Sequence, residues 1–248
     1  MSAAVQIVGL AVAVALAVAV AEPLPSLSTI GFSLLGGAIG VLGILGLYHG
    51  LAVGRMGVVA PVSGVLGATV PVIVGMVIAG LPKTQVLLGI ALAVIAVPLV
   101  SASRSGDDRP SGLRFAILGG VGIGLFGATF GAIPDGAVAW PLAIFKFSAL
   151  VTIGIAASLA RASLRLPAAV VPAAVAVALL DLTGNGLFLL AAQVGRLDIA
   201  ATLSSLYPVT TVILAWALLN ERLSRVHVLG IVVAAVAIAL IAGGTATG

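Results

Sequence analysis

The sequence has 248 residues, of which 62% are hydrophobic and only 7% are charged. Soluble domains carry about 25% charged residues, so this chain has too little polar surface to cover a globule in water and needs lipid as its solvent. The formal charge of +4 comes from basic residues scattered through turns, which excludes a nucleic-acid footprint, and the absence of Cys excludes disulfides, thiolate metal sites and cysteine nucleophiles.

A membrane-spanning helix needs about 20 mostly apolar residues. Apolar runs of this kind, separated by charged residues, Pro or Gly, predict nine spanning helices at residues 4–21, 29–52, 57–79, 85–101, 113–131, 138–160, 168–192, 199–219 and 226–243. No basic residue precedes the first run, and its length exceeds the apolar core of a signal peptide. This favours a spanning helix; a secretory signal cleaved in the small residues before Glu22 is the alternative.

The chain nearly repeats itself at a constant offset of 141 residues. The most polar stretch, residues 101–114, lies between the two copies and predicts a first repeat at 1–101, a linker at 102–112 and a second repeat at 113–244. The residues that recur in register are Gly54-Arg55 as Gly195-Arg196, Ser63 as Ser204, Thr69 as Thr210, and Leu88-Gly89-Ile90 as Leu229-Gly230-Ile231. Internal repeats in a membrane protein are typical of transporters built from two related halves.

The second repeat contains five predicted helices and the first contains four. Because five is odd, successive five-helix units enter the membrane in opposite directions, which predicts an inverted repeat that pairs 57–101 with 198–242. A helix equivalent to 113–131 is missing before Met1. A misassigned start, a short gene or a partner that supplies the helix would each explain this.

The basic residues are unevenly divided between the two ends of the helices. If the side that bears residue 1 is called side A, its loops hold eight arginines, whereas side B loops hold only Lys83 and Arg196. This excess predicts that side A is cytoplasmic. The eight are Arg55, Arg104, Arg109, Arg114, Arg161, Arg165, Arg222 and Arg225.

Two ionisable residues, Lys146 and Asp181, fall inside apolar runs. A charge at the centre of a helix costs about 2.5–3.5 kcal/mol on insertion scales, so such residues usually face a bundle interior and pair. Counted at about 1.5 Å per residue, Lys146 lies roughly 12 Å and Asp181 roughly 16 Å from side B, which a lysine side chain can bridge. Asn185 follows Asp181 by four residues and shares its helix face. Snorkelling of Lys146 to the interface is the alternative.

Both repeats are broken by proline near mid-depth. Tyr207-Pro208 lies roughly 12 Å from side B, and Pro61 and Pro71 flank the equivalent position in the first repeat. Such breaks are tolerated in a membrane where the backbone is buried in protein or faces water, as it does in helices that line a cavity. The predicted substrate-binding residues, on a cavity open toward side B, are Lys146, Asp181, Asn185, Ser204, Tyr207 and Pro208.

Residues 203–241 resemble the second repeat of the EamA family, in the drug/metabolite transporter superfamily. The residues that carry the likeness are Leu206-Tyr207-Pro208, Asn220-Glu221-Arg222-Leu223-Ser224 and Leu229-Gly230-Ile231. Residues 54–75 and 87–93 look like the corresponding parts of the first repeat. Such proteins usually have ten helices, and the first of these is absent here. Many ten-helix members have both ends cytoplasmic, which conflicts with the orientation that the excess of basic residues on side A predicts. The first repeat also departs from the pattern, with Gly80-Leu81-Pro82 in place of the Glu-Arg pair.

The sequence therefore predicts an all-α polytopic membrane protein that exports or exchanges a small metabolite. We expect it to be embedded in the lipid bilayer of a bacterial inner (cytoplasmic) membrane. Neither a cofactor nor a nucleic-acid partner is expected; Gly119-Gly120-Val121-Gly122 is no phosphate loop, because no strand precedes it and no Lys follows. Coupling to protons through Asp181 is the hypothesis for its energy source. A non-transporting assembly partner and a membrane-embedded enzyme are the alternatives, and the oligomeric state stays open.

Overall fold

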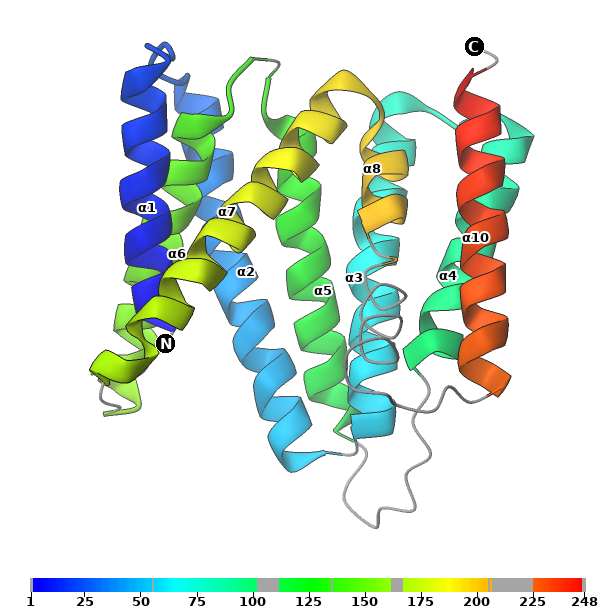
Figure 1. Cartoon of the computed structure of the whole chain (residues 1–248), viewed down its shortest axis with the longest axis horizontal. Coiled ribbons are helices and arrows are strands. Elements are labelled where there is room, and N and C mark those ends of the chain that lie inside the picture. Colours follow the sequence, from blue (N-terminus) through cyan, green and yellow to red (C-terminus); the bar gives the residue numbers. More distant parts are fainter. Residues whose placement is uncertain are drawn as a thin grey trace. The chain divides into compact units, whose positions relative to one another are not determined.

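The computed structural model of the chain describes residues 2–54, 56–101, 112–134, 136–161, 167–204, 206 and 225–246. All regular elements in these residues are helical (Figure 1). Among them, five helices are long and apolar enough to cross a membrane, and three shorter apolar helices accompany them. The predicted all-α polytopic membrane fold is confirmed.

The helices follow the predicted apolar runs, and their described ends differ from the predicted ends by no more than three residues. Two short 3-10 segments, η1 (Phe130–Ala132) and η2 (Ala168–Val170), adjoin α5 and α7. The run predicted at 199–219 is described only at its start, because residues 207–224 lie outside the described part. The helices are α1 (Ser2–Ala19), α2 (Leu27–Val53), α3 (Met56–Ala79), α4 (Thr84–Ser101), α5 (Leu113–Thr129), α6 (Ala139–Leu159), α7 (Val171–Val194), α8 (Leu197–Ser204) and α10 (Arg225–Ala246).

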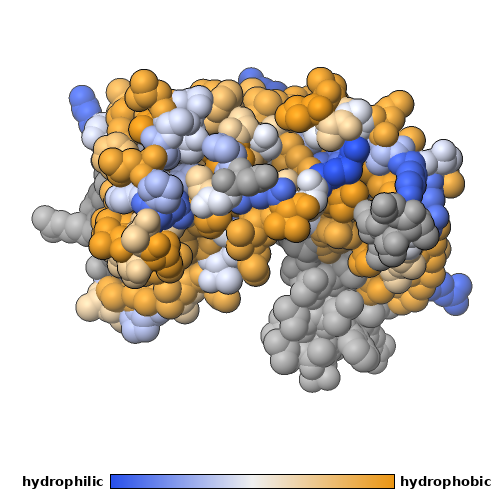
Figure 2. Space-filling model, turned by 90° about the horizontal axis from the view of Figure 1, so that it is seen from above, coloured by the Kyte–Doolittle hydropathy of each residue, from blue (hydrophilic) through white to orange (hydrophobic). Residues whose placement is uncertain are grey.

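Large apolar side chains lie on the outside of these helices. Val77 is 79% exposed, Leu159 82% and Leu180 74%, and hydrophobic residues dominate the face drawn in Figure 2. A water-soluble monomer rarely exposes apolar surface on this scale. The exposed residues therefore fit a lipid environment.

The chain forms two compact units, and each unit combines parts of both sequence repeats. Unit 1 comprises Met1–Leu42 with Leu125–Val194, and unit 2 comprises Gly43–Gly124 with Gly195–Gly248. The helices α2 and α5 each contribute to both units. The repeat bounds at 1–101 and 113–244 stay a prediction, because a repeat is defined by sequence and these units by contacts.

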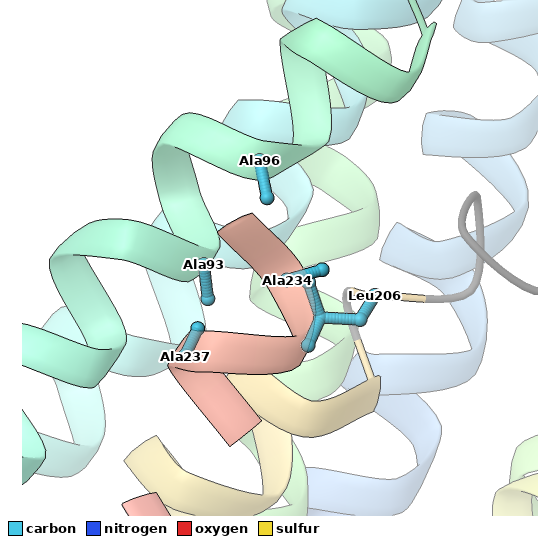
Figure 3. Close-up of a cluster of buried hydrophobic side chains, with 5 residues drawn as sticks. All are labelled: Ala93, Ala96, Leu206, Ala234 and Ala237. Atoms are coloured by element: carbon cyan, nitrogen blue, oxygen red, sulfur yellow. The ribbon is translucent and has the colours of Figure 1, made fainter. Parts of the chain in front are cut away.

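In unit 2, α4 packs closely against α10 through small residues (Figure 3). Ala93, Ala96, Ala234 and Ala237 are all fully buried there, and Ala93 faces Ala237. At the 141-residue offset, Ala93 is the equivalent of Ala234 and Ala96 that of Ala237. The interface is therefore built from the same two positions of each repeat, as in a contact about a two-fold axis.

The directions of the equivalent helices agree with an inverted repeat. Within unit 2 the chain rises along α3 and α10 and descends along α4 and α8 (Figure 1). Each helix of the first repeat thus runs opposite to its equivalent in the second, α3 to α8 and α4 to α10. The same holds in unit 1 for α1 and α6, which pack against each other.

Unit 1 has an aromatic core between α5, α6 and α7. The ring of Phe130, which is 1% exposed, lies 5.0 Å from that of Phe145 and 5.1 Å from that of Phe188, measured between centroids. Phe126 closes the cluster from α5. Nearer the start of α7, Val5 of α1 packs against Ala174 and Ala178. These contacts hold α1, α6 and α7 together around the polar residues described next.

Candidate functional site

The two ionisable residues predicted inside apolar runs meet in unit 1. Nζ of Lys146, on α6, donates to Oδ2 of Asp181, on α7, and the two side chains form an ion pair. The Lys146 side chain is 7% exposed, whereas that of Asp181 is 38% exposed. Lys146 therefore does not snorkel to the interface. Asp181 is the more exposed residue of the pair.

Asn185 fixes the carboxylate from the next turn of α7. Its Nδ2 donates to Oδ1 of Asp181 at 2.9 Å and to the Asp181 backbone oxygen at 2.8 Å. Residues four apart on a helix are neighbours, which explains why this spacing gives the contact. One carboxylate oxygen thus accepts from Lys146 and the other from Asn185, so the orientation of the Asp181 carboxylate is set from both sides.

A glycine of α1 makes room for the lysine side chain. A Cβ at Gly9 would lie 3.3 Å from both Cδ and Cε of Lys146. The aliphatic part of Lys146 therefore runs directly over the backbone of α1. Three helices, α1, α6 and α7, build this cluster.

The structure brings together three of the six predicted substrate-binding residues: Lys146, Asp181 and Asn185. Ser204 lies exposed at the end of α8, in unit 2. Tyr207 and Pro208 lie outside the described residues. Whether any of the six binds a substrate stays a prediction.

The model of the EamA-like transporter family matches residues 110–243, more than half of the chain. The chain belongs to the EamA-like transporter family. The predicted resemblance is confirmed, and the family is one of membrane transporters in the drug/metabolite transporter superfamily.

A solved crystal structure is similar to this EamA-like chain over 99% of the chain and 86% of its own length, with a TM-score of 0.67 and 17% sequence identity. At that identity the similarity shows the fold alone. No curated protein matches the chain.

In this EamA-like chain, Glu22 joins the end of α1 to the start of α6. Its Oε2 accepts from the backbone N–H groups of Val138, at 3.2 Å, and Ala139, at 2.8 Å, and its Oε1 accepts from that of Trp140 at 2.9 Å. The indole Nε1 of Trp140 donates back to the Glu22 backbone oxygen at 3.0 Å. A carboxylate at this position satisfies N–H groups that a helix leaves unpaired and complements its dipole.

Glu22→Ala is expected to lower the free energy of unfolding by about 0.5–2 kcal/mol, the usual value of a helix cap, because three backbone donors lose their acceptor. Thermal unfolding of the purified protein in detergent measures this loss. Glu22→Gln is the control, since its single amide oxygen keeps part of the cap, and it should fall between the wild type and Glu22→Ala. Unfolding curves that coincide for all three proteins would contradict the capping role.

A second charged cluster lies in unit 2, where Arg196 links the start of α8 to the end of α3. Asp198 is 0% exposed, and its two oxygens accept from Nε and Nη2 of Arg196 at 3.1 and 3.0 Å. The same guanidinium donates to the backbone oxygens of Ala79, at 3.1 Å, and Gly80. Arg196 thereby caps the carboxyl end of α3. Gly80 has a φ of +74°, the conformation glycine favours at helix ends.

Sequence reasoning missed the partners of Glu22, Arg196 and Asp198. It assigned Arg196 to a side B loop and predicted no interaction partner for Glu22 or Asp198. It also passed over Gln6 and Gly9 in the first apolar run. A single polar residue in an otherwise apolar run was the available signal for Gln6, and no sequence pattern marks Gly9 among the many glycines of the chain.

Proposed function

We propose that this chain is a secondary active transporter that exports or exchanges a small metabolite by alternating access between its two inverted repeats, with Asp181 as the proton-coupling group. The observation that supports this most directly is the Lys146–Asp181 ion pair inside apolar helices. Ionisable residues at such depth are costly and typical of substrate or proton pathways.

The geometry of the pair favours a functional role over a purely structural one. The Lys146 side chain is 7% exposed, whereas the Asp181 side chain keeps 38% of its surface exposed. We infer that the exposed side of the carboxylate faces the proposed cavity, where a proton or a cationic group can replace Lys146. While the site is empty, Lys146 neutralises Asp181. The empty transporter can therefore change conformation without moving an unpaired carboxylate charge through the membrane.

The proposed substrate-binding set keeps all six residues of the second repeat. Lys146, Asp181 and Asn185 supply a charge pair and an amide. Ser204, Tyr207 and Pro208 stay in the proposed set on the sequence alone, because the first two carry hydroxyl groups and Pro208 has no backbone N–H. Such a set suits a small molecule with an amino group and further hydrogen-bonding groups.

Reconstitution in proteoliposomes tests the proton-coupling role. A panel of amines and amino acids is screened with a pH-sensitive dye inside the vesicles, and wild-type protein should move protons with its substrate. Asp181→Asn should abolish uptake driven by a pH gradient, because Asn keeps the shape of Asp but cannot titrate. Counterflow of labelled substrate, which needs no net proton movement, should persist in that variant.

Glu22→Gln is the matched control, since it also changes a carboxylate to an amide in unit 1 but outside the ion pair. It should keep pH-driven uptake. The proposed coupling role is refuted if Asp181→Asn retains the full pH dependence of uptake.

A further inference from the structure

The described residues contain two buried side-chain polar atoms without a hydrogen-bond partner, Oε1 of Gln6 and Oγ of Ser33. Buried polar groups in native proteins are nearly always satisfied, so each exception calls for an explanation. An amide oxygen is a strong acceptor and can receive a charged donor. Gln6 lies in unit 1, on α1, one of the three helices that build the cluster around the ion pair.

The position of Gln6 on α1 places it on the buried face of that helix, which packs against α6 and α7. The buried residues of that helix include Ala3, Gly9, Ala13 and Ala17, and at 100° per residue Gln6 falls in the middle of the arc that they span. The helices α1 and α6 pack extensively against each other. Residues three apart share a helix face, so Gln6 is one turn from Gly9, over which the Lys146 side chain runs.

The ammonium of Lys146 can reach that turn. Cδ and Cε of Lys146 lie beside Gly9, and three residues of α1 correspond to about 4.5 Å along the helix axis. A lysine side chain has four rotatable bonds and three donors on its ammonium. In the described structure that ammonium donates to Asp181. A change of rotamer would bring it to the level of Gln6.

We propose that the Gln6 amide oxygen is a second acceptor for the Lys146 ammonium, used when a proton or a small organic cation occupies Asp181. This rests on the proposed function in one respect, that Asp181 is where the cation binds. Lys146 then acts as a tethered counter-ion: it neutralises Asp181 in the empty carrier and moves to Gln6 in the loaded carrier.

The free groups around Asp181 indicate the class of that cation. Asn185 donates to Asp181 through Nδ2, which leaves its Oδ1 as an acceptor beside the more exposed carboxylate. The groups offered to a ligand are thus acceptors only. They fit a cation that carries N–H donors, such as a protonated primary amine, better than a quaternary ammonium, which has none.

The test compares the stability of variants in detergent and needs no substrate. Asp181→Asn mimics a neutralised carboxylate, and Gln6→Met removes the second acceptor at similar volume. In the wild type, Gln6→Met should leave the Tm unchanged or raise it, since an unpaired amide is lost. In the Asp181→Asn background the same change should lower the Tm by about 2–4 °C, because Lys146 has then lost both its charged partner and the second acceptor.

Two controls isolate the contact. Ser33→Ala removes the other unpaired buried atom and should have the same effect in both backgrounds. Adding Lys146→Met to Asp181→Asn should abolish the effect of Gln6→Met. An effect of Gln6→Met that is equal with and without Asp181→Asn would overturn the proposal.

A second double variant, in which the carboxylate is moved from position 181 to position 6, tests the proposal if Asp181→Asn/Gln6→Met does not fold. Asp181→Asn combined with Gln6→Glu should rebuild the ion pair at the second position and raise the Tm above that of Asp181→Asn alone. A Tm at or below that of Asp181→Asn also overturns the proposal. Because these readouts involve no transport, they fail independently of the flux test of proton coupling.

Discussion

Arg196→Met is expected to lower the free energy of unfolding by about 3–5 kcal/mol, the cost of leaving a buried charge without its partner. Asp198 is 0% exposed. Once Arg196 is lost, the only donor to the Asp198 carboxylate within the described residues is the backbone N–H of Ile199, at 3.0 Å. The end of α3 loses its cap in the same variant. Chemical denaturation in detergent, followed by Trp fluorescence, measures the loss.

The double variant Arg196→Met/Asp198→Asn separates the unpaired charge from the lost packing. Asn keeps the acceptor for Ile199 but carries no charge, so this variant should recover more than half of the lost stability. Arg161→Met, at an exposed arginine that also follows a long helix, should stay near the wild type. A double variant no more stable than Arg196→Met would show that the buried charge is not the cause.

Gly75→Ala should destabilise the protein by about 1–3 kcal/mol or more, as overpacking does. A Cβ at Gly75 would overlap the backbone nitrogen of Asp198 and come within 2.9 Å of its Cα. Backbone atoms cannot rotate away, so α3 and α8 would have to separate. This result would be measured by the same denaturation experiment.

Gly184→Ala is the matched control, because both glycines lie within long helices and a Cβ at Gly184 meets nothing within 4 Å. There the higher helix propensity of Ala should raise stability by up to about 1 kcal/mol. The two substitutions are therefore expected to differ in sign. Two effects of the same sign would contradict the close approach of α3 and α8.

The sequence was sufficient for the helices and for the ion pair, because both depend on local spacing. Apolar runs of spanning length located the helices, and a rise of 1.5 Å per residue placed Lys146 and Asp181 at similar depth. The four-residue spacing likewise explained Asn185. Each of these inferences uses distance along a helix, which the sequence gives directly.

The contacts that join distant segments could not be read in this way. Nothing in the sequence marks Asp198 as buried, yet it is 0% exposed and pairs with Arg196, whose guanidinium also reaches the end of α3. Glu22 likewise finds its donors more than a hundred residues away. Helix ends leave backbone groups unpaired at both termini, but nothing in the sequence says which charged residue will satisfy them.

The interleaving of the two repeats has a consequence for the order in which the protein is made. Synthesis begins at the amino terminus, and domains that consist of continuous sequence can fold as they emerge. Here α1 leaves the ribosome long before α6 and α7, its packing partners in unit 1. The same delay separates α4 from α10 in unit 2. Part of the packing of each unit can therefore form only during translation of the second repeat, after the helices of the first repeat have been made.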